Sequence, residues 1–296
     1  WNAQRAGDWA DLPEHAQKIG ARLVVTPLLH PTDEYHRAGR RGLDAVAARL
    51  VTDPKRFASL RAGRWDIARR ARDVLSNAEV VLLAHQNEAA LVRTWCGADA
   101  LRTAVVPPAV PRIEATPTKP PLQGDFVLSV GRIEPLKNPL AVLAAARRLR
   151  LPVVFVGSMV RGRHMLHGRR FRQNVKRQGA RWLGPLPADK VRGLMRRARV
   201  HVLASWTEVL GRVTVEAALE GCATVSSRVG HAPALLGETE GAFWTAPGDE
   251  RALTQALAAA WAHGRRPDGP LATRATELLW DAVAPALLAA YPGPAG

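Results

Sequence analysis

The chain has 296 residues, of which 47% are apolar, and a formal net charge of +16. This length and composition argue against disorder and predict two domains of roughly 100 to 150 residues each. The only cysteines, Cys96 and Cys222, lie in apolar segments, which excludes a disulfide framework and fits a reducing compartment. No secretory signal is visible near Trp1, and the apolar runs are too short to span a bilayer, so we expect a soluble, cytoplasmic protein.

Arginine supplies nearly all of the positive charge, because lysine occurs only at positions 18, 55, 119, 137, 176 and 190. A field of this sign attracts phosphate-bearing substrates, anionic lipid headgroups and nucleic acids alike. The alternative is a compositional bias that is spread over solvated helix faces. Charge alone therefore does not select a partner.

Short apolar runs alternate with longer helical patterns along almost the whole chain. This alternation is typical of parallel strands joined by crossover helices, so the predicted class is α/β. In the first third we expect strands at residues 22–28, 79–84 and 102–106, and an arginine-rich helix at about 56–77. Three strands make a thin sheet for such a domain, so we expect the chain to begin inside a domain, after its first strands.

A dense proline cluster separates this region from a second alternating series. The prolines stand at positions 107, 108, 111, 117, 120 and 121, and they predict an irregular linker. Beyond it we expect strands at residues 126–130, 153–156, 180–183, 200–204 and 223–226, and a helix at 271–291 after the Gly- and Pro-rich stretch 264–270. The predicted domains are residues 1–118 with the linker, 119–270, and a crossover helix with its tail at 271–296.

Two loops that follow predicted strands carry the chemistry. In an open parallel sheet, ligands bind beyond the carboxyl ends of the strands. The first loop holds Gly131, Arg132 and Lys137, and its two cations can converge on one diphosphate. Asn138 is a natural cap for the next helix. The alternative is a cationic surface turn with a helix cap.

The second loop runs from Ser205 to Ala217. Gly211 lets the backbone approach a ligand, and the helix that starts near it offers free N–H groups to an anion. Glu208 precedes this helix and Glu216 lies inside it among apolar residues, where a carboxylate needs hydroxyl or cationic partners. Ribose hydroxyls would meet that need. The alternative is an ion pair between Glu216 and Arg212, four residues earlier.

The order of motifs resembles a known family. VGRIEPLKN, VVFVGS, WLGPLPADKV, VHVLASWTEVLGRVTVEAALEG, CATVSSRVGHAPALLG and WDAVAPALLAAY occur in the order and spacing of the donor-binding domain of retaining GT-B glycosyltransferases of family four, the glycosyl transferases group 1. The likeness covers residues 126–291, and the two glutamates eight positions apart are its most specific element. It implies a GT-B fold, in which two Rossmann-like parallel-sheet domains face a cleft, with the N-terminal domain incomplete here. In this family a glycine-rich loop follows the first strand, and this chain has no counterpart of it.

The resemblance also implies roles for individual residues. Arg132 and Lys137 would neutralise the diphosphate, Glu208 would contact the hydroxyls of the donor sugar, and Glu216 would bind the ribose. The other expected donor-binding residues are Val209, Leu210 and Gly211 through backbone groups, Trp182, Leu183 and Leu186 at the base, and Gly131, Gly157 and Ser205. The likeness of VVTPLLHP to a family strand makes His30 a candidate that faces the cleft; the alternative is an ordinary loop histidine.

The function implied is metal-independent, retaining transfer of a hexosyl group from a UDP-, GDP- or ADP-sugar to a glycan, a lipid or a small molecule. No cofactor is expected, and the sequence contains no D-x-D triplet that would indicate a metal site. One alternative is a nucleotide-sugar epimerase or hydrolase, because a fold alone does not fix the reaction. Another is a non-catalytic basic binding module, although the sequence lacks the motifs that specify nucleic acid, which is therefore not an expected partner.

Residues 161–177 form a basic stretch with seven arginines and lysines and no acid. One hypothesis is peripheral contact with an anionic membrane, at the inner face of the bilayer. The alternative is a solvated basic helix. His164 and His167 lie three residues apart, but no further metal ligands accompany them.

Overall fold

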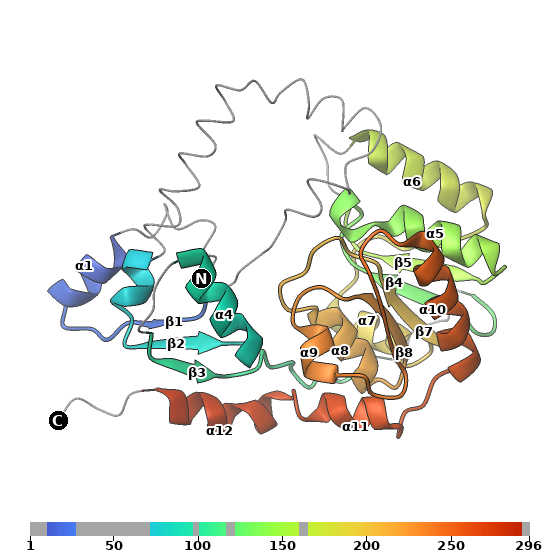
Figure 1. The fold of residues 1–296 in the computed structure, drawn as a ribbon. Coiled ribbons are helices and arrows are strands. Elements are labelled where there is room, and N and C mark those ends of the chain that lie inside the picture. The colour runs from blue at the N-terminus through green and yellow to red at the C-terminus, as the bar shows by residue number, and fades with distance from the viewer. Residues whose placement is uncertain (1–10, 28–71, 97–100, 117–121, 160–164, 292–296) are drawn as a thin grey trace. The chain divides into compact units, whose positions relative to one another are not determined.

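The computed structural model describes residues 11–27, 72–96, 101–116, 122–159 and 165–291. The described residues fall into two compact units, each with its own parallel sheet (Figure 1). One unit includes the described residues up to Pro108 and those from Val283 onward, and the other includes Ala109 to Ala282. The predicted α/β class is confirmed.

The first unit contains a three-stranded sheet of order β1-β2-β3. Its strands are β1 (Val24–Val25), β2 (Val80–Leu83) and β3 (Thr103–Val105), and its helices include α1 (Leu12–Lys18) and α4 (Gln86–Cys96). The core is formed by Val25, Val74, Leu75, Val81, Leu83 and Val92. The three predicted strands are therefore present but shorter than expected. Most of the arginine-rich helix predicted at 56–77 lies outside the described residues, and helix is present at 72–76.

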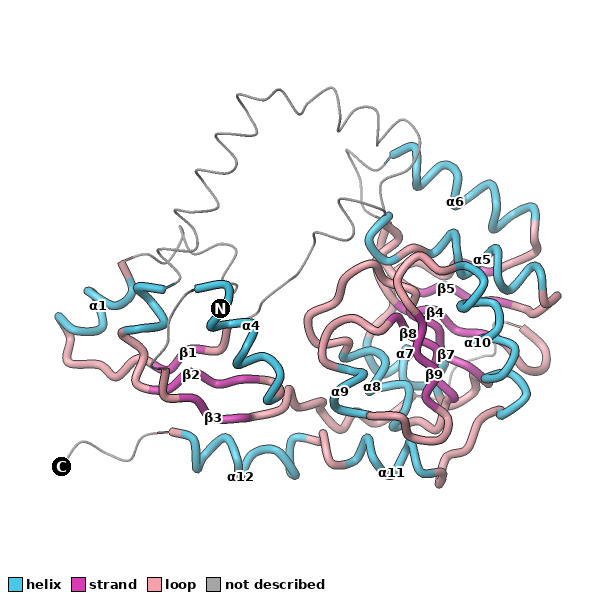
Figure 2. The backbone as a smooth tube through the Cα atoms, viewed as in Figure 1, coloured by secondary structure: helices cyan, strands magenta, loops and turns pink. Residues whose placement is uncertain are grey.

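The second unit contains a six-stranded parallel sheet of order β6-β5-β4-β7-β8-β9 (Figure 2, magenta). Its strands are β4 (Val127–Val130), β5 (Val153–Val156), β6 (Arg181–Trp182), β7 (Val200–Leu203), β8 (Ala223–Ser227) and β9 (Ala242–Thr245). The five predicted strands are all found, with small differences at their ends. The strand β9 was not predicted, because its half-buried residues form neither a clear alternation nor a continuous apolar run.

Helices cover both faces of this sheet. They are η3 (Pro135–Lys137), α5 (Pro139–Arg148), α6 (Met165–Arg177), α7 (Ala188–Met195), α8 (Arg212–Leu219), α9 (Ala232–Leu236) and α10 (Glu250–His263). Val127 and Val202 face the core that includes α5 and α10, whereas Leu128 and Val154 face the core that includes α7 and α8. Strands buried on both faces are nearly continuous apolar runs, as the sequence shows for β4 and β5.

The C-terminal segment forms two helices, α11 (Pro270–Thr276) and α12 (Trp280–Ala290), so the single helix predicted at 271–291 is wrong. Leu279 lies between them and pairs with Val110 in an isolated parallel bridge. The Val110 N–H donates to the Leu278 carbonyl at 2.8 Å, and the Trp280 N–H donates to the Val110 carbonyl at 3.2 Å. Backbone pairing with the proline-rich segment thus interrupts the helix. None of the helices described is long and apolar enough to cross a membrane.

Candidate functional site

The predicted site residues gather at the carboxyl ends of the strands of the second unit. In the sheet, β5 lies on one side of β4 and β7 on the other, so the chain changes direction at β4. Ligands of open α/β sheets bind at such a switch point. The loops that follow β4 and β7 meet there, because the Trp206 N–H donates to the Leu136 carbonyl at 2.8 Å.

Lys137 and Glu208, from these two loops, form an ion pair in which the ammonium Nζ donates to Oε1 of the carboxylate. The Ser205 hydroxyl donates to the same oxygen at 2.7 Å. The side chains of Lys137 and Glu208 are 18% and 13% exposed. The structure therefore joins a predicted phosphate-binding cation to a predicted sugar-binding acid, a contact that the sequence analysis did not foresee.

Arg132 is also paired with a carboxylate. Its Nη2 lies 2.8 Å from Oε1 of Glu134, a buried residue, while Arg132 itself is 61% exposed. The Ile133 N–H donates to the Ser158 carbonyl at 2.8 Å, which fixes the loop against the segment after β5. Asn138 occupies the predicted N-cap position of α5, but its side chain forms no capping bond there. Its backbone is left-handed, with φ of 51°, a conformation that asparagine tolerates.

Two predicted glycines stand where a side chain would not fit. Gly157 follows β5 with φ of 141°, and a Cβ at this position would lie 2.0 Å from the Gly131 carbonyl oxygen. Gly211 has φ of 62°, and its Cβ would lie 2.8 Å from the Cβ of Ala232. Gly157 therefore lets the backbone after β4 approach closely, and Gly211 leaves room for the side chain of Ala232 in α9.

The N-terminus of α8 follows Gly211 directly. Within the described part of the chain, the amide groups of Val209, Leu210 and Gly211 donate to no backbone or side-chain acceptor. The Val209 carbonyl accepts from the His231 N–H at 3.0 Å, which joins this loop to the one after β8. Free amides at the start of a helix are suited to an anion.

Glu216 lies one turn into α8 with its side chain 20% exposed. Burial raises the pKa of its carboxyl group, and the charges of Arg192 and Arg212 oppose that rise. Nη2 of Arg212 is 3.9 Å from Oε1 of Glu216, so the alternative pair is present but long. A largely buried carboxylate whose ion pair with Arg212 is this long retains acceptor capacity for a ligand.

Arg192 supports this region and was missed in the sequence. It is buried, and its guanidinium donates to the carbonyl oxygens of Glu216 at 2.8 Å and Pro111 at 3.0 Å. Its Nη1 also lies 3.5 Å from Oε1 of Glu220. It thereby joins α8 to Pro111, within the proline cluster. In an arginine-rich chain, nothing distinguishes this arginine from those on solvated helix faces.

The three residues predicted at the base lie in different surroundings. Trp182 packs edge-on against Phe171, and its Nε1 donates to the Gly157 carbonyl at 3.0 Å. Leu186 packs into the core shared with α7 and α8, whereas Leu183 is exposed. Trp182 is thus tied to the glycine edge of the site, and Leu183 is the accessible apolar side chain of the three.

His30 lies outside the described residues. Among the residues described, no cluster of three or more histidine, cysteine, aspartate or glutamate side chains could hold a metal ion.

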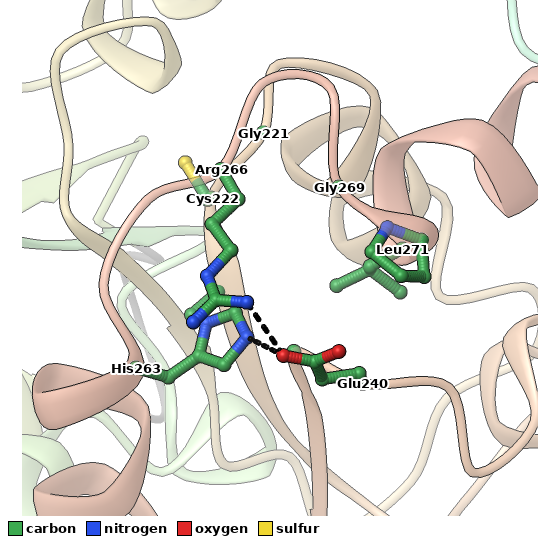
Figure 3. Close-up of a pocket in the computed structure, with 10 residues that line it drawn as sticks. Gly221, Cys222, Glu240, His263, Arg266, Gly269 and Leu271 are labelled. Carbon is green, nitrogen blue, oxygen red and sulfur yellow. Dashed lines mark hydrogen bonds and ion pairs between the residues drawn. The ribbon is translucent and has the colours of Figure 1, made fainter.

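A small cavity of about 10 Å³ lies at the amino-terminal ends of β8 and β9, away from the loops described above. Its lining includes Gly221, Cys222, Glu240 and His263 (Figure 3). It has barely the volume of one water molecule. Glu240 bridges His263 Nε2 at 3.3 Å and Arg266 Nη1 at 2.6 Å (Figure 3). Burial raises the pKa of the Cys222 thiol to about 12, so this cysteine is not poised as a nucleophile. The two contacts of Glu240 hold the end of α10 and the segment after it against the turn before β9.

A parallel sheet whose strand order reverses at β4, with helices on both faces, defines an α/β domain of Rossmann-like type. Solved structures extend this to the GT-B fold. The chain matches sucrose-phosphate synthase from Thermosynechococcus elongatus with a TM-score of 0.67 at 20% identity, over 97% of this chain and 77% of that one. HepE of Anabaena, in complex with UDP and glucose, gives a TM-score of 0.68 at 17% identity, over 96% and 74%. These likenesses show a shared fold.

Sequence comparisons show similarity to one family over part of the chain. Residues 124–263 match the model described as Glycosyl transferases group 1. D-inositol 3-phosphate glycosyltransferase from Acidothermus cellulolyticus is 30% identical over 56% of this chain and 43% of its own length. D-inositol 3-phosphate glycosyltransferase 2 from Catenulispora acidiphila is 29% identical over 69% and 50%. The chain spans about half the length of these relatives. The match of residues 124–263 to the glycosyl transferases group 1 family agrees with the resemblance that the motifs carry.

Proposed function

We propose that this chain binds a nucleoside-diphosphate sugar in its second unit and takes part in sugar transfer with retention at the anomeric carbon and without a metal. The observation that carries the proposal is the meeting of Lys137, Glu208 and the free amides before α8 at the switch point of the sheet. A cation, helix-terminal amides and a hydroxyl-binding carboxylate are the groups that a sugar diphosphate requires. The family assignment supports the same activity.

The chemical task is to stabilise a departing nucleoside diphosphate while positive charge develops on the sugar. Lys137 and Arg132 would compensate the phosphate oxygens, together with the amides of Val209, Leu210 and Gly211. When phosphate approaches, it competes with Glu208 for Lys137, and the released carboxylate becomes available to sugar hydroxyls. Glu216, deeper in α8, would accept from the ribose.

The printed names of the relatives suggest which ligands to test first. HepE was solved with UDP and glucose, and the names of the two relatives include D-inositol 3-phosphate. We propose a uridine diphosphate sugar as the donor and, as the acceptor, a hydroxyl group of a small molecule, a glycan or a lipid headgroup.

Nucleotide binding is the direct test because it concerns the second unit alone. Thermal shift and titration calorimetry with UDP, GDP and ADP should show saturable binding of one of them, since a ligand of the native state raises its melting temperature. Lys137→Ala and Arg132→Ala should each weaken this binding, whereas Arg148→Ala, an exposed arginine on α5 paired with Glu250, should leave it unchanged. Binding that is insensitive to both site substitutions contradicts the assignment.

Product analysis then separates the reactions. With the UDP-sugar and an acceptor, retention predicts that NMR shows the donor's anomeric configuration in the product, and added EDTA should not lower turnover. Each of the two alanine variants should raise the barrier by about 2–4 kcal/mol, as expected for loss of a preorganised charge. Release of free sugar without transfer would favour the hydrolase alternative, and a changed sugar on the nucleotide would favour an epimerase.

A further inference from the structure

The helix α6 carries positive charge that the proposed function does not use. It contains no acidic residue, and its exposed cations are Arg169, Arg170, Arg172, Lys176 and Arg177. In the described part of the chain, none of these cations forms an ion pair. By contrast, α5, α7, α8 and α11 each contain an arginine paired with a carboxylate. The positive charge of α6 is therefore less compensated than that of these four helices.

Packing divides α6 into two faces. Phe171 is fully buried with its ring 5.1 Å from that of Phe155, and Gly168 lies against the Met159 side chain. The opposite, outward face is defined by helical spacing and consists of Leu166, Arg169, Arg170, Gln173 and Arg177. Figure 1 shows α6 on the outside of α5, against which it packs. The outward face is thus a basic strip along the whole described helix.

The exposed cations of α6, on this strip and beside it, include like charges on adjacent helical turns. Arg169 and Arg172 are three residues apart, and Arg172 and Lys176 are four apart, and such pairs repel. An anionic partner would relieve this repulsion and supply the missing counter-charges. Leu166, at the start of the strip, is 50% exposed and follows the same spacing as the outward arginines.

We propose that the outward face of α6 docks on an anionic lipid bilayer, with its arginines at the headgroup phosphates and Leu166 at the boundary of the acyl chains. Basic helices with an apolar side chain among their cations bind at this depth of a membrane. A nucleic-acid backbone would satisfy the arginines but would leave Leu166 without an apolar contact. The exposed leucine therefore favours lipid over nucleic acid. This inference does not rest on the proposed function.

The test is co-sedimentation of the full chain with vesicles of phosphatidylcholine alone or mixed with phosphatidylglycerol. We expect binding to the mixed vesicles only. The triple variant Arg169→Gln/Arg170→Gln/Arg177→Gln should lower the partition coefficient about a hundredfold, at roughly fivefold for each cation near the surface. Arg172 is left in place because its guanidinium lies over the Trp182 ring. The charge-matched control, Arg112→Gln/Arg197→Gln/Arg251→Gln, replaces exposed arginines outside α6 and should retain most of the binding.

A second variant distinguishes lipid from nucleic acid. Leu166→Ser keeps the charge and should lower partitioning onto mixed vesicles about tenfold, because half of a leucine side chain loses its apolar surroundings. The proposal is overturned if phosphatidylcholine alone binds equally well, or if the control triple variant loses as much as the α6 variant. It is also overturned if Leu166→Ser binds vesicles normally while the α6 variant loses affinity for a labelled RNA duplex. Nucleoside diphosphate binding should be unchanged in every variant, which keeps this test separate from that of the proposed function.

Discussion

Substitutions in the ion pair between Lys137 and Glu208 should separate its effect on stability from its effect on ligand binding. Lys137→Met leaves Glu208 with the Ser205 hydroxyl as its remaining partner, at 13% exposure. Removing one member of a largely buried pair costs more than the pair contributes, and because both side chains keep some solvent contact we expect about 1–3 kcal/mol. For a chain of this size, each kcal/mol lowers the melting temperature by roughly 2–4 °C.

Glu208→Gln should destabilise the protein less, by about 1 kcal/mol, because an amide oxygen still accepts from Nζ. The double variant removes both charges, so its loss should be smaller than the sum of the two single losses by at least about 0.5 kcal/mol. Arg148→Met and Glu250→Gln provide the matched cycle, since that pair is 3.6 Å apart and its members are 55% and 40% exposed. Its coupling should be close to zero.

The same substitutions should change nucleotide affinity in a different order from stability. Glu208→Gln frees Lys137 from its competing carboxylate, so nucleoside diphosphate affinity should rise by up to about fivefold, the equivalent of roughly 1 kcal/mol. Sugar transfer should fall in the same variant. Lys137→Met and the double variant should both lose nucleotide affinity, although the double variant regains stability. Chemical denaturation and calorimetry measure the two quantities; additive stabilities, or nucleotide affinity restored in the double variant, would refute the reasoning.

Further predictions concern three other positions. Burial raises the pKa of Glu216 in the folded protein above 4.5, so Glu216→Gln should be more stable than the parent at pH values well above the folded-state pKa. This advantage should shrink as the pH falls through the folded-state pKa and vanish below 4.5, which denaturation measured across pH checks. The same variant should lose about 2 kcal/mol of nucleotide binding free energy at neutral pH. Gly157→Ala should destabilise the protein by about 2 kcal/mol or more, since its Cβ would overlap the Gly131 carbonyl oxygen. Gly179→Ala is the control, because the space around it is open, and thermal melting should show only the smaller cost of a positive φ. Arg192→Leu should cost about 3 kcal/mol and weaken nucleotide binding indirectly, with normal nucleotide affinity in the variant as the contrary result.

The fold of the second unit was predictable because buried parallel strands have a local signature. Val153 to Val156 is a continuous apolar run, and Phe126 to Val130 is interrupted only by Ser129. Both have the length of a strand and are followed by glycine, so the local pattern identifies them. β9 lacked that signature. The break between α11 and α12 depends on a backbone pairing with Val110, more than a hundred residues away, which no local pattern encodes.

For the candidate site, the sequence indicates which residues take part but not which of them contact one another. Gly157 and Gly211 were chosen as ligand-side glycines, and in the structure their backbone geometry excludes a side chain. The pairing of Lys137 with Glu208 links positions 71 residues apart, and it follows from the adjacency of β4 and β7 in the sheet. Arg192 was invisible for a related reason, because its importance lies in two carbonyl partners on distant segments.

Both cations proposed to bind phosphate are paired with carboxylates, and this affects how a ligand binds at the site. Arg132 lies beside Glu134 and Lys137 beside Glu208, so the site is charge-compensated without a donor. A diphosphate must then exchange with carboxylates instead of filling an uncompensated cationic pocket, which moderates its affinity. Because Glu208 is the group displaced and is also the group proposed to contact the sugar, donor binding and carboxylate release become one event. A bare inorganic pyrophosphate makes the exchange without giving Glu208 a new partner, so it should gain more than the nucleotide sugar does from Glu208→Gln. Equal gains for the two ligands would show that the carboxylate does not pass from the lysine to the sugar.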